Sequence, residues 1–145
     1  MTRMSNAHDL AHYRWVTTLP TRWADNDMFG HVNNAAYYVL IDTALGQLLT
    51  QGCHFDPISS PYINVVLKNQ CHYLSSLRYP DEVKIGVSVE KIGRSSVTYE
   101  VGLFRNSEQK ACAVASVIEV WLDRATQESI EVPTAIRQWL DSLMH

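Results

Sequence analysis

The feature that most restricts the fold is an apolar pattern that begins at Val32 and keeps the period of an α-helix for about five turns. Apolar or small residues recur at intervals of three and four: Val32, Ala35, Ala36, Val39, Leu40, Thr43, Ala44 and Leu48, with Tyr37, Ile41, Leu45 and Leu49 on much of the remaining circumference. A helix that is apolar nearly all round is buried, so we expect other elements to surround it. Asn33 is a candidate N-cap, and Gly52 a candidate residue just past the C-terminal end.

Segments with the alternation of β-strands lie on both sides of this helix. One precedes it at residues 13–22, where Pro20 suits an edge strand or a bulge. Four more are predicted at residues 62–73, 82–90, 97–103 and 110–123, with a short helix after Pro133. Successive strands with one segregated helix indicate an α+β protein with an antiparallel sheet. A strongly curved sheet could cover a single apolar helix, as in the hotdog fold, where an antiparallel sheet is wrapped around one long central helix.

Length and composition fit one domain. The chain has 145 residues, of which 46% are hydrophobic and 19% charged, so a single hydrophobic core is expected. We assign residues 1–12 to a flexible leader and residues 13–145 to a single domain. The formal net charge is −3, and the Lys and Arg residues are scattered, so no basic surface for nucleic acid is predicted.

The cysteines and the first residues indicate the compartment. Cys53, Cys71 and Cys112 lie far apart in sequence without zinc spacing, so we expect reduced thiols and no metal site. Residues 1–12 lack the apolar region of a signal peptide, and no run approaches the ~20 apolar residues of a membrane span. We therefore expect a cytoplasmic protein with no membrane partner.

Polar groups are concentrated directly before the apolar helix. The ten residues 25–34 include the carboxylates Asp25 and Asp27, Gly30, His31 and the asparagines Asn33 and Asn34. Folding alone does not explain so many polar groups next to a helix that is meant for burial. We take this segment as the candidate active site.

The block D-x-D-x-x-G-H-x-N-N at residues 25–34, followed by Tyr37 and Asp42, resembles the signature of hotdog-fold acyl-CoA thioesterases of the 4-hydroxybenzoyl-CoA thioesterase family. Residues 79–83 and the turn at residues 93–95 are also similar to that family, and the resemblance extends from Arg14 to Leu122. It implies a thioester hydrolase that releases a free carboxylic acid and CoA. The resemblance implies no cofactor, because CoA is part of the substrate.

The resemblance also implies residue roles. Asp27 matches the catalytic carboxylate of the family, and the N–H groups at the start of the helix, here Asn34 and its neighbours, would polarise the thioester carbonyl. Arg94 and Ser95 match residues that contact CoA. The active site would then lie at a dimer interface, with Asp27 from one subunit and parts of the pocket from the other. His31 departs from the family prototype and instead resembles the histidine of the H-V-N-N block in plant acyl-carrier-protein thioesterases, so the acyl carrier stays open.

The chemistry of these residue types agrees with a role in thioester hydrolysis, which needs an activated water or nucleophile and donors for the oxyanion. Asp27 lies just before a helix whose N-terminus carries a partial positive charge and unpaired N–H groups. Asp27 could attack the carbonyl itself or act as general base for water, and as a lone Asp it could simply cap the helix. For Asp25 we expect a structural hydrogen bond.

Two roles are also possible for Gly30, His31 and Asn33 of the block and for Asp42 in the helix. Gly30 supplies either a backbone conformation closed to other residues or a close approach of substrate. His31 orients Asp27 or the substrate carbonyl, or hydrogen-bonds within the loop. Asn33 contacts substrate or caps the helix. Asp42, an acid within an apolar helix, is either a second active-site carboxylate or a buried or intersubunit hydrogen-bonding group.

Two other functions remain open. A hotdog hydratase or dehydratase acting on acyl-CoA or acyl-carrier protein would use His31 with Asp42, and a non-catalytic acyl-CoA binding module would use the fold as a receptor. One helix under one sheet leaves apolar surface and sheet edges uncovered, so we expect a homodimer or homotetramer. Acyl chain length and type do not follow from the sequence.

Overall fold

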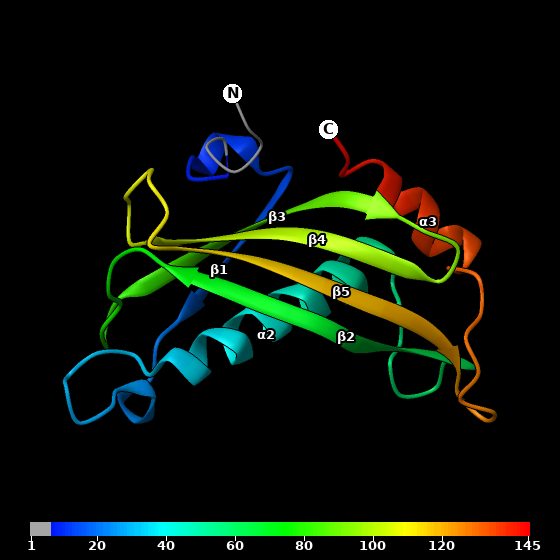
Figure 1. The fold of residues 1–145 in the computed structure, drawn as a ribbon, viewed down its shortest axis with the longest axis horizontal. Helices are drawn as coiled ribbons and strands as arrows, with labels where there is room; N and C mark the ends of the chain where they lie inside the picture. The colour runs from blue at the N-terminus through cyan, green and yellow to red at the C-terminus, as the bar shows by residue number, and fades with distance from the viewer. Residues whose placement is uncertain (1–6) are drawn as a thin grey trace.

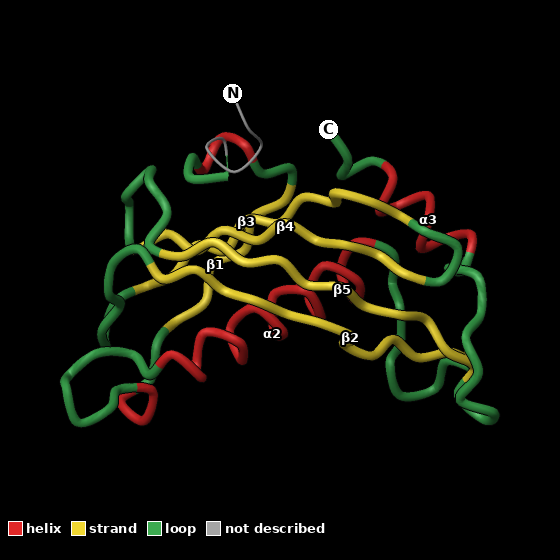
Figure 2. Tube along the Cα trace, viewed as in Figure 1, coloured by secondary structure: helices red, strands yellow, loops and turns green. Residues whose placement is uncertain are grey.

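The computed structural model describes residues 7–145, and its main feature is a five-stranded antiparallel sheet in the order β1-β3-β4-β5-β2 (Figure 1). The strands are β1 (Trp15–Pro20), β2 (Tyr62–Tyr73), β3 (Glu82–Ile92), β4 (Ser96–Arg105) and β5 (Ala113–Asp123). Helix α2 (Asn34–Gly52) lies along one face of the sheet, and α3 (Thr134–Asp141) packs near one end (Figures 1 and 2). Among the described residues no helix is long and apolar enough to cross a membrane. The predicted antiparallel α+β architecture is confirmed.

Both edges of the sheet follow from the sequence. Pro20 ends β1, which pairs only with β3, and an edge tolerates a residue that lacks an N–H. The other edge is β2, a strand of 12 residues that pairs with β5, with a register shift between Val66 and Lys68 where Leu67 is skipped. In the described chain the second side of β2 has no partner strand. A long, unpaired edge strand therefore runs beside α2.

Helix α2 is buried on one side only, which corrects the expectation of a helix surrounded all round. Its buried side consists of Tyr37, Leu40, Ile41, Ala44, Leu45, Leu48 and Leu49, which pack on the inward-facing residues of the sheet. The opposite side is open, and Val39 is 58% exposed. Asp42 and Thr43 are also exposed there.

The segment expected to be a flexible leader is described in part. Residues 1–6 lie outside the described residues. Residues 7–12 include the 3₁₀ turn η1 (Leu10–His12), and Ala7 is buried with Tyr13, Phe104 and Val114 on the face of the sheet away from α2. Tyr13 donates a hydrogen bond from its hydroxyl to the Ala7 carbonyl at 2.7 Å. Within the described residues, Ala7 is therefore packed together with Tyr13.

The sequence predicted that Gly52 lies just past the C-terminal end of the helix. In the structure Gly52 is the last residue of α2. The Trp139 indole of α3 lies against it, and Trp139 Nε1 donates to the Leu48 carbonyl at 3.0 Å. A Cβ on Gly52 would lie 2.2 Å from the indole ring. The glycine is therefore required by the packing of α3 and not by a left-handed cap.

Candidate active site

The loop before α2 is held by Asp25. Its carboxylate accepts from the Arg22 backbone N–H at 2.8 Å and from the Arg22 guanidinium at 2.8 and 3.1 Å, and its carbonyl accepts from the Asn33 N–H at 2.8 Å. Burial raises the pKa of Asp25, but these bonds outweigh burial and hold the pKa below its ordinary value. The predicted structural role of Asp25 is confirmed.

Asp27 is oriented by a tight turn. Its Oδ1 accepts from the Phe29 N–H at 2.9 Å, and its carbonyl accepts from the Gly30 N–H at 3.0 Å. Gly30 has φ +79°, a conformation that few other residues adopt, while the space around its Cα is open. The first reading of Gly30, a backbone role, is therefore supported. Among the described residues the second carboxylate oxygen of Asp27 has no partner.

The N-terminus of α2 leaves a donor free. Asn33 is the N-cap, and its Oδ1 accepts from the Ala35 N–H at 2.9 Å, as the capping reading predicted. The N–H groups of Val32 and Asn33 donate to the carbonyls of Leu77 and Asp25. Within the described structure the Asn34 N–H has no acceptor. This N–H lies at the first helical position, where the helix field favours negative charge.

One pocket contains both Asp27 and Asn34. It has a volume of about 350 Å³, and its lining also includes Val32, Tyr37, Tyr73, Leu74, Ser75 and Ser76. The Tyr73 hydroxyl donates to the Asn34 carbonyl at 3.1 Å, and the rings of Tyr73 and Tyr37 meet edge to face at 4.9 Å. These contacts hold the end of β2 over the start of α2. The pocket is therefore built from the predicted loop and the far end of the edge strand.

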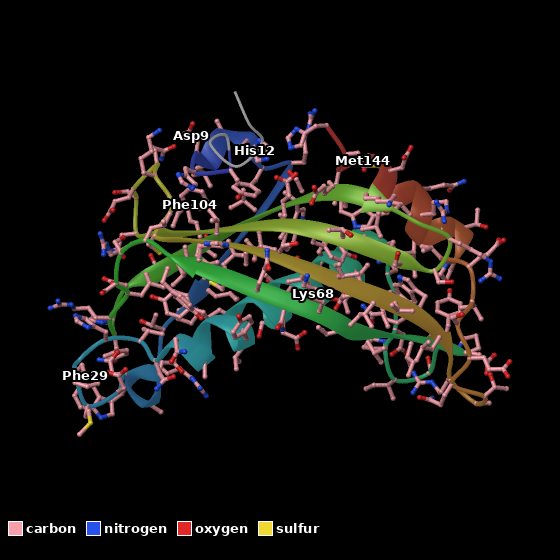
Figure 3. The ribbon with its side chains drawn as sticks, viewed as in Figure 1. Asp9, His12, Phe29, Lys68, Phe104 and Met144 are labelled. Carbon is pink, nitrogen blue, oxygen red and sulfur yellow. The ribbon has the colours of Figure 1, made fainter. Side chains whose placement is uncertain are left out.

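The structure does not bring all of the predicted residues into this pocket. Gly30, His31 and Asn33 do not line it, and His31 contributes only its carbonyl, which accepts from the Asp27 N–H at 2.8 Å. Asp42 lies eight residues after Asn34, about 12 Å along the helix. It lines a different pocket, described below. Phe29 lies at the tip of the loop, on the α2 side of the sheet (Figure 3).

Arg94 and Ser95 lie at the other end of the molecule from Asp27. They form the turn between β3 and β4, and β3 is 11 residues long, which separates its two ends by roughly 35 Å (Figure 1). Arg94 donates to Ser95 Oγ at 3.2 Å and lies 3.9 Å from a carboxylate oxygen of Glu131. Within one chain these residues cannot share a site with Asp27.

Sequence reasoning missed two groups of residues. Leu74, Ser75 and Ser76 form one wall of the pocket together with Tyr73, and only their place directly after an edge strand could have indicated this. Glu119 lies in the strand predicted at residues 110–123, on the same face as Val117 and Trp121, and is buried like them. An acid at an inward position of a central strand was the signal.

A cluster of side chains of the types that can bind metal ions lies elsewhere. Among residues 7–145, the ligand atoms of His12, Glu100 and His145 lie within 4.8 Å of one another. His12 Nε2 is 3.2 Å from Glu100 Oε2, and the rings of His12 and His145 stack at 4.2 Å. Figure 3 shows His12 on the opposite side of the sheet from α2. No group of this kind includes Asp27 in the part of the chain that is described.

Comparison with known proteins places this chain in a family. The family model of the thioesterase-like superfamily matches residues 21–140, so the chain belongs to that superfamily. Its sheet and helix are those of the hotdog fold of this superfamily.

Individual relatives agree with this assignment. The crystal structure of the PA5185 protein from Pseudomonas aeruginosa is 32% identical, with a TM-score of 0.89, and the match covers 91% of this chain and 92% of that one. The uncharacterized protein YsmA of Bacillus subtilis is 23% identical over 84% of this chain and 86% of its own length. The DHNA-CoA thioesterase of Staphylococcus aureus has a TM-score of 0.76 at 20% identity, covering 88% and 86% of the two chains, which shows a common fold.

Proposed function

We propose that this protein is an acyl-CoA thioesterase that hydrolyses the thioester to a free carboxylic acid and CoA, with Asp27 as the catalytic carboxylate. The observation that carries the proposal is the shared pocket of Asp27 and Asn34. Membership of the thioesterase-like superfamily supports this activity. The fold is shared with a thioesterase that acts on a CoA ester, the DHNA-CoA enzyme.

The geometry divides the chemistry between two groups. The thioester carbonyl oxygen would accept a hydrogen bond from the Asn34 N–H. This hydrogen bond would strengthen as the tetrahedral oxyanion forms. The free oxygen of Asp27 would either remove a proton from the attacking water or attack the carbonyl carbon itself. In both routes the C–S bond breaks, the CoA thiolate leaves and takes up a proton, and the acid is released after water has supplied its oxygen. The Phe29 N–H holds the other oxygen of Asp27 and so fixes the direction of the carboxylate.

A second copy of the chain would complete the site. The free edge of β2 exposes apolar side chains at Val65, Val66 and Leu67, and Leu67 is 68% exposed. An unpaired edge of this length is a template for another strand. We infer a homodimer in which β2 pairs with β2 of the second copy, so that the ten-stranded sheet covers both helices.

This pairing accounts for the distance between Asp27 and Arg94. Two-fold symmetry makes the β2 pair antiparallel, so the Tyr73 end of one strand lies near the Tyr62 end of the other. Tyr73 lies at the Asp27 pocket, while Tyr62 lies at the same end of the sheet as Arg94. The second copy would therefore bring Arg94 and Ser95 toward the Asp27 pocket, where they would contact the CoA phosphates.

The hydratase alternative is less well supported. It needs His31 beside Asp42, and His31 lines neither the Asp27 pocket nor the pocket that contains Asp42. The Asp27 pocket, in contrast, contains a carboxylate and a free N–H, which are the two groups that thioester hydrolysis requires.

Thiol release from a panel of acyl-CoAs, including aromatic and aliphatic acyl groups, tests the proposal. We expect release by the wild type and a loss of about a hundredfold or more in Asp27→Asn. The Asn variant keeps the acceptor for the Phe29 N–H. Asp123→Asn is a matched control, because Asp123 Oδ1 accepts from the Ala125 N–H at 2.9 Å in the same kind of turn, outside the lining of the Asp27 pocket. No release from any acyl-CoA, or equal rates in Asp27→Asn, would overturn the proposal.

A further inference from the structure

A second pocket lies between α2 and β2. It has a volume of about 210 Å³ and is lined by Asp42 and Leu49 of α2, Phe55 of the following loop, Asn64 of β2 and Glu119 of β5, among others. The described residues that line it include two carboxylates and an aromatic ring but no Lys, Arg or His. The pocket is thus acidic as well as partly apolar, and the thioesterase mechanism above does not use it.

Glu119 is the unusual group in this pocket. It is 4% exposed, although buried carboxylates are rare without a cationic partner. One oxygen accepts from Asn64 Nδ2 at 2.9 Å. The other oxygen has no partner among the described residues. The pKa of Glu119 is raised to about 7, mainly by burial. The hydrogen bond from Asn64 partly opposes this increase, and the nearby charge of Asp42 adds to it.

Among the described residues that line the pocket, no cationic side chain faces these two carboxylates. Asp42 and Glu119 repel each other when both are ionised, and a cation between them would remove the repulsion and satisfy the free oxygen of Glu119. Phe55 adds an aromatic ring, and aromatic faces attract ammonium groups. The small volume suits one ammonium or trimethylammonium group rather than a large ring system.

We propose that Asp42, Asn64 and Glu119 form a subsite for a cationic ammonium group carried by the acyl chain of the substrate. This inference rests on the proposed thioesterase function, because it names the class of acyl group that the enzyme takes. Glu119 and Asp42 receive the positive charge, and Asn64 holds Glu119 in place. Glu119 thereby determines specificity without taking part in bond cleavage.

The proposed dimer gives this subsite a route to Asp27. Asn64 and Val66 lie toward the Tyr62 end of β2, and the antiparallel pairing places that end of one chain near the Asp27 pocket of the other. An acyl chain whose thioester lies at Asp27 would then extend into the acidic pocket of the second copy.

The first test compares acyl-CoAs of matched length whose far end is a methyl, a hydroxyl, a primary ammonium or a trimethylammonium group. We expect kcat/KM of the wild type to be at least about tenfold higher for an ammonium substrate than for the methyl and hydroxyl ones. Glu119→Gln replaces the acceptor by a donor, so this ratio falls by about tenfold or more. Glu128→Gln, at an exposed position, keeps the ratio. An unchanged ratio in Glu119→Gln, or a wild type that does not prefer the ammonium substrates, would overturn the inference.

A second test measures binding without hydrolysis. Calorimetry with free aminoalkanoic and trimethylammonio-alkanoic acids, against alkanoic acids of the same length, should show binding of the cationic acids only, weakened in Glu119→Gln. Because the ionised carboxylate binds the cation, affinity should increase as the pH rises through about 7. Asp42 and Tyr99 are the titratable groups whose charges interact with Glu119, and Cys53 lies near Tyr99. If no acyl-CoA releases thiol, the thioesterase proposal fails, while this measurement still decides the subsite; equal binding of cationic and neutral acids would contradict it.

Discussion

Trp139 of α3 lies directly against Gly52 at the end of α2, and its ring occupies the space where a Cβ on Gly52 would lie, at 2.2 Å. The Nε1 of the same indole donates to the Leu48 carbonyl. This contact ties the C-terminal helix to the helix whose other end forms the candidate active site.

Gly52→Ala should therefore reduce stability, by about 1–3 kcal/mol, because the indole must move or its hydrogen bond must break. Gly46→Ala is the matched control. Gly46 lies in the same helix with nothing within 4 Å of its Cβ position, so Ala should raise stability by about 0.5–1 kcal/mol. Denaturant unfolding of both variants measures the difference, and two variants of equal stability would show that Trp139 does not need the glycine.

The elements were largely predictable from the sequence. The bounds of β2 match the prediction, because period-two patterning between turn residues is a local signal. Pro20 and Asn33 act at their predicted positions, since an edge strand and an N-cap are each set by one residue type. The open side of α2 was not predictable, because its small and apolar residues are equally suited to a buried surface and to one that a second chain covers.

The candidate site was predictable only in part. The segment around Asp27 is contiguous, so sequence reveals it, whereas the pocket wall at Tyr73 comes from a strand whose position over α2 is a tertiary contact. The subsite around Glu119 combines three elements, and its pairing with Asn64 depends on strand order. Sequence spacing carries no information about that order. Arg94 was placed by resemblance, and its distance from Asp27 became evident only with the fold.

The Asp25 carboxylate should contribute a pH-dependent part of stability. Its pKa in the folded chain lies below the ordinary 3.8, so its contribution is present above that pH and is lost as the pH falls through the folded value. Asp25→Asn should cost about 1 kcal/mol at neutral pH, reduced by screening of the exposed guanidinium of Arg22. Unfolding at a series of pH values measures this. A deficit that persists unchanged in acid would argue that packing, not charge, holds the loop.

Glu119 should have the opposite pH dependence. Its pKa is raised from 4.5 to about 7, so its favourable contribution is complete below 4.5 and is lost as the pH rises through about 7. Glu119→Gln should remove this dependence of the free energy of unfolding on pH. In mild alkali the variant should be more stable than the wild type by roughly 2–3 kcal/mol. Thermal or denaturant unfolding with Glu128→Gln as control tests it. A wild type whose stability does not fall over this range would contradict the burial of Glu119 without a cationic partner.

Mixed dimers should reveal whether Asp27 and Arg94 act across the interface. Arg94→Ala should raise the KM for acyl-CoA about tenfold by removing a phosphate contact. A heterodimer of Asp27→Asn with Arg94→Ala would contain one intact site and should recover about half of the wild-type kcat/KM. The reciprocal heterodimer pairs a wild-type chain with a chain that carries both Asp27→Asn and Arg94→Ala. If each site takes Asp27 from one chain and Arg94 from the other, this heterodimer contains no intact site. Recovery in the reciprocal pair only would mean that both residues serve one site within a single chain.

The most direct measurement of the central claim is a single-turnover reaction with enzyme in excess over acyl-CoA, in which free thiol is followed with time. Product release does not limit this rate, so it reports the chemical step. Wild-type protein should convert the bound ester, and Asp27→Asn should do so about a hundredfold more slowly or worse while binding CoA with similar affinity. Equal rate constants for the two proteins would contradict catalysis by Asp27 at the start of α2.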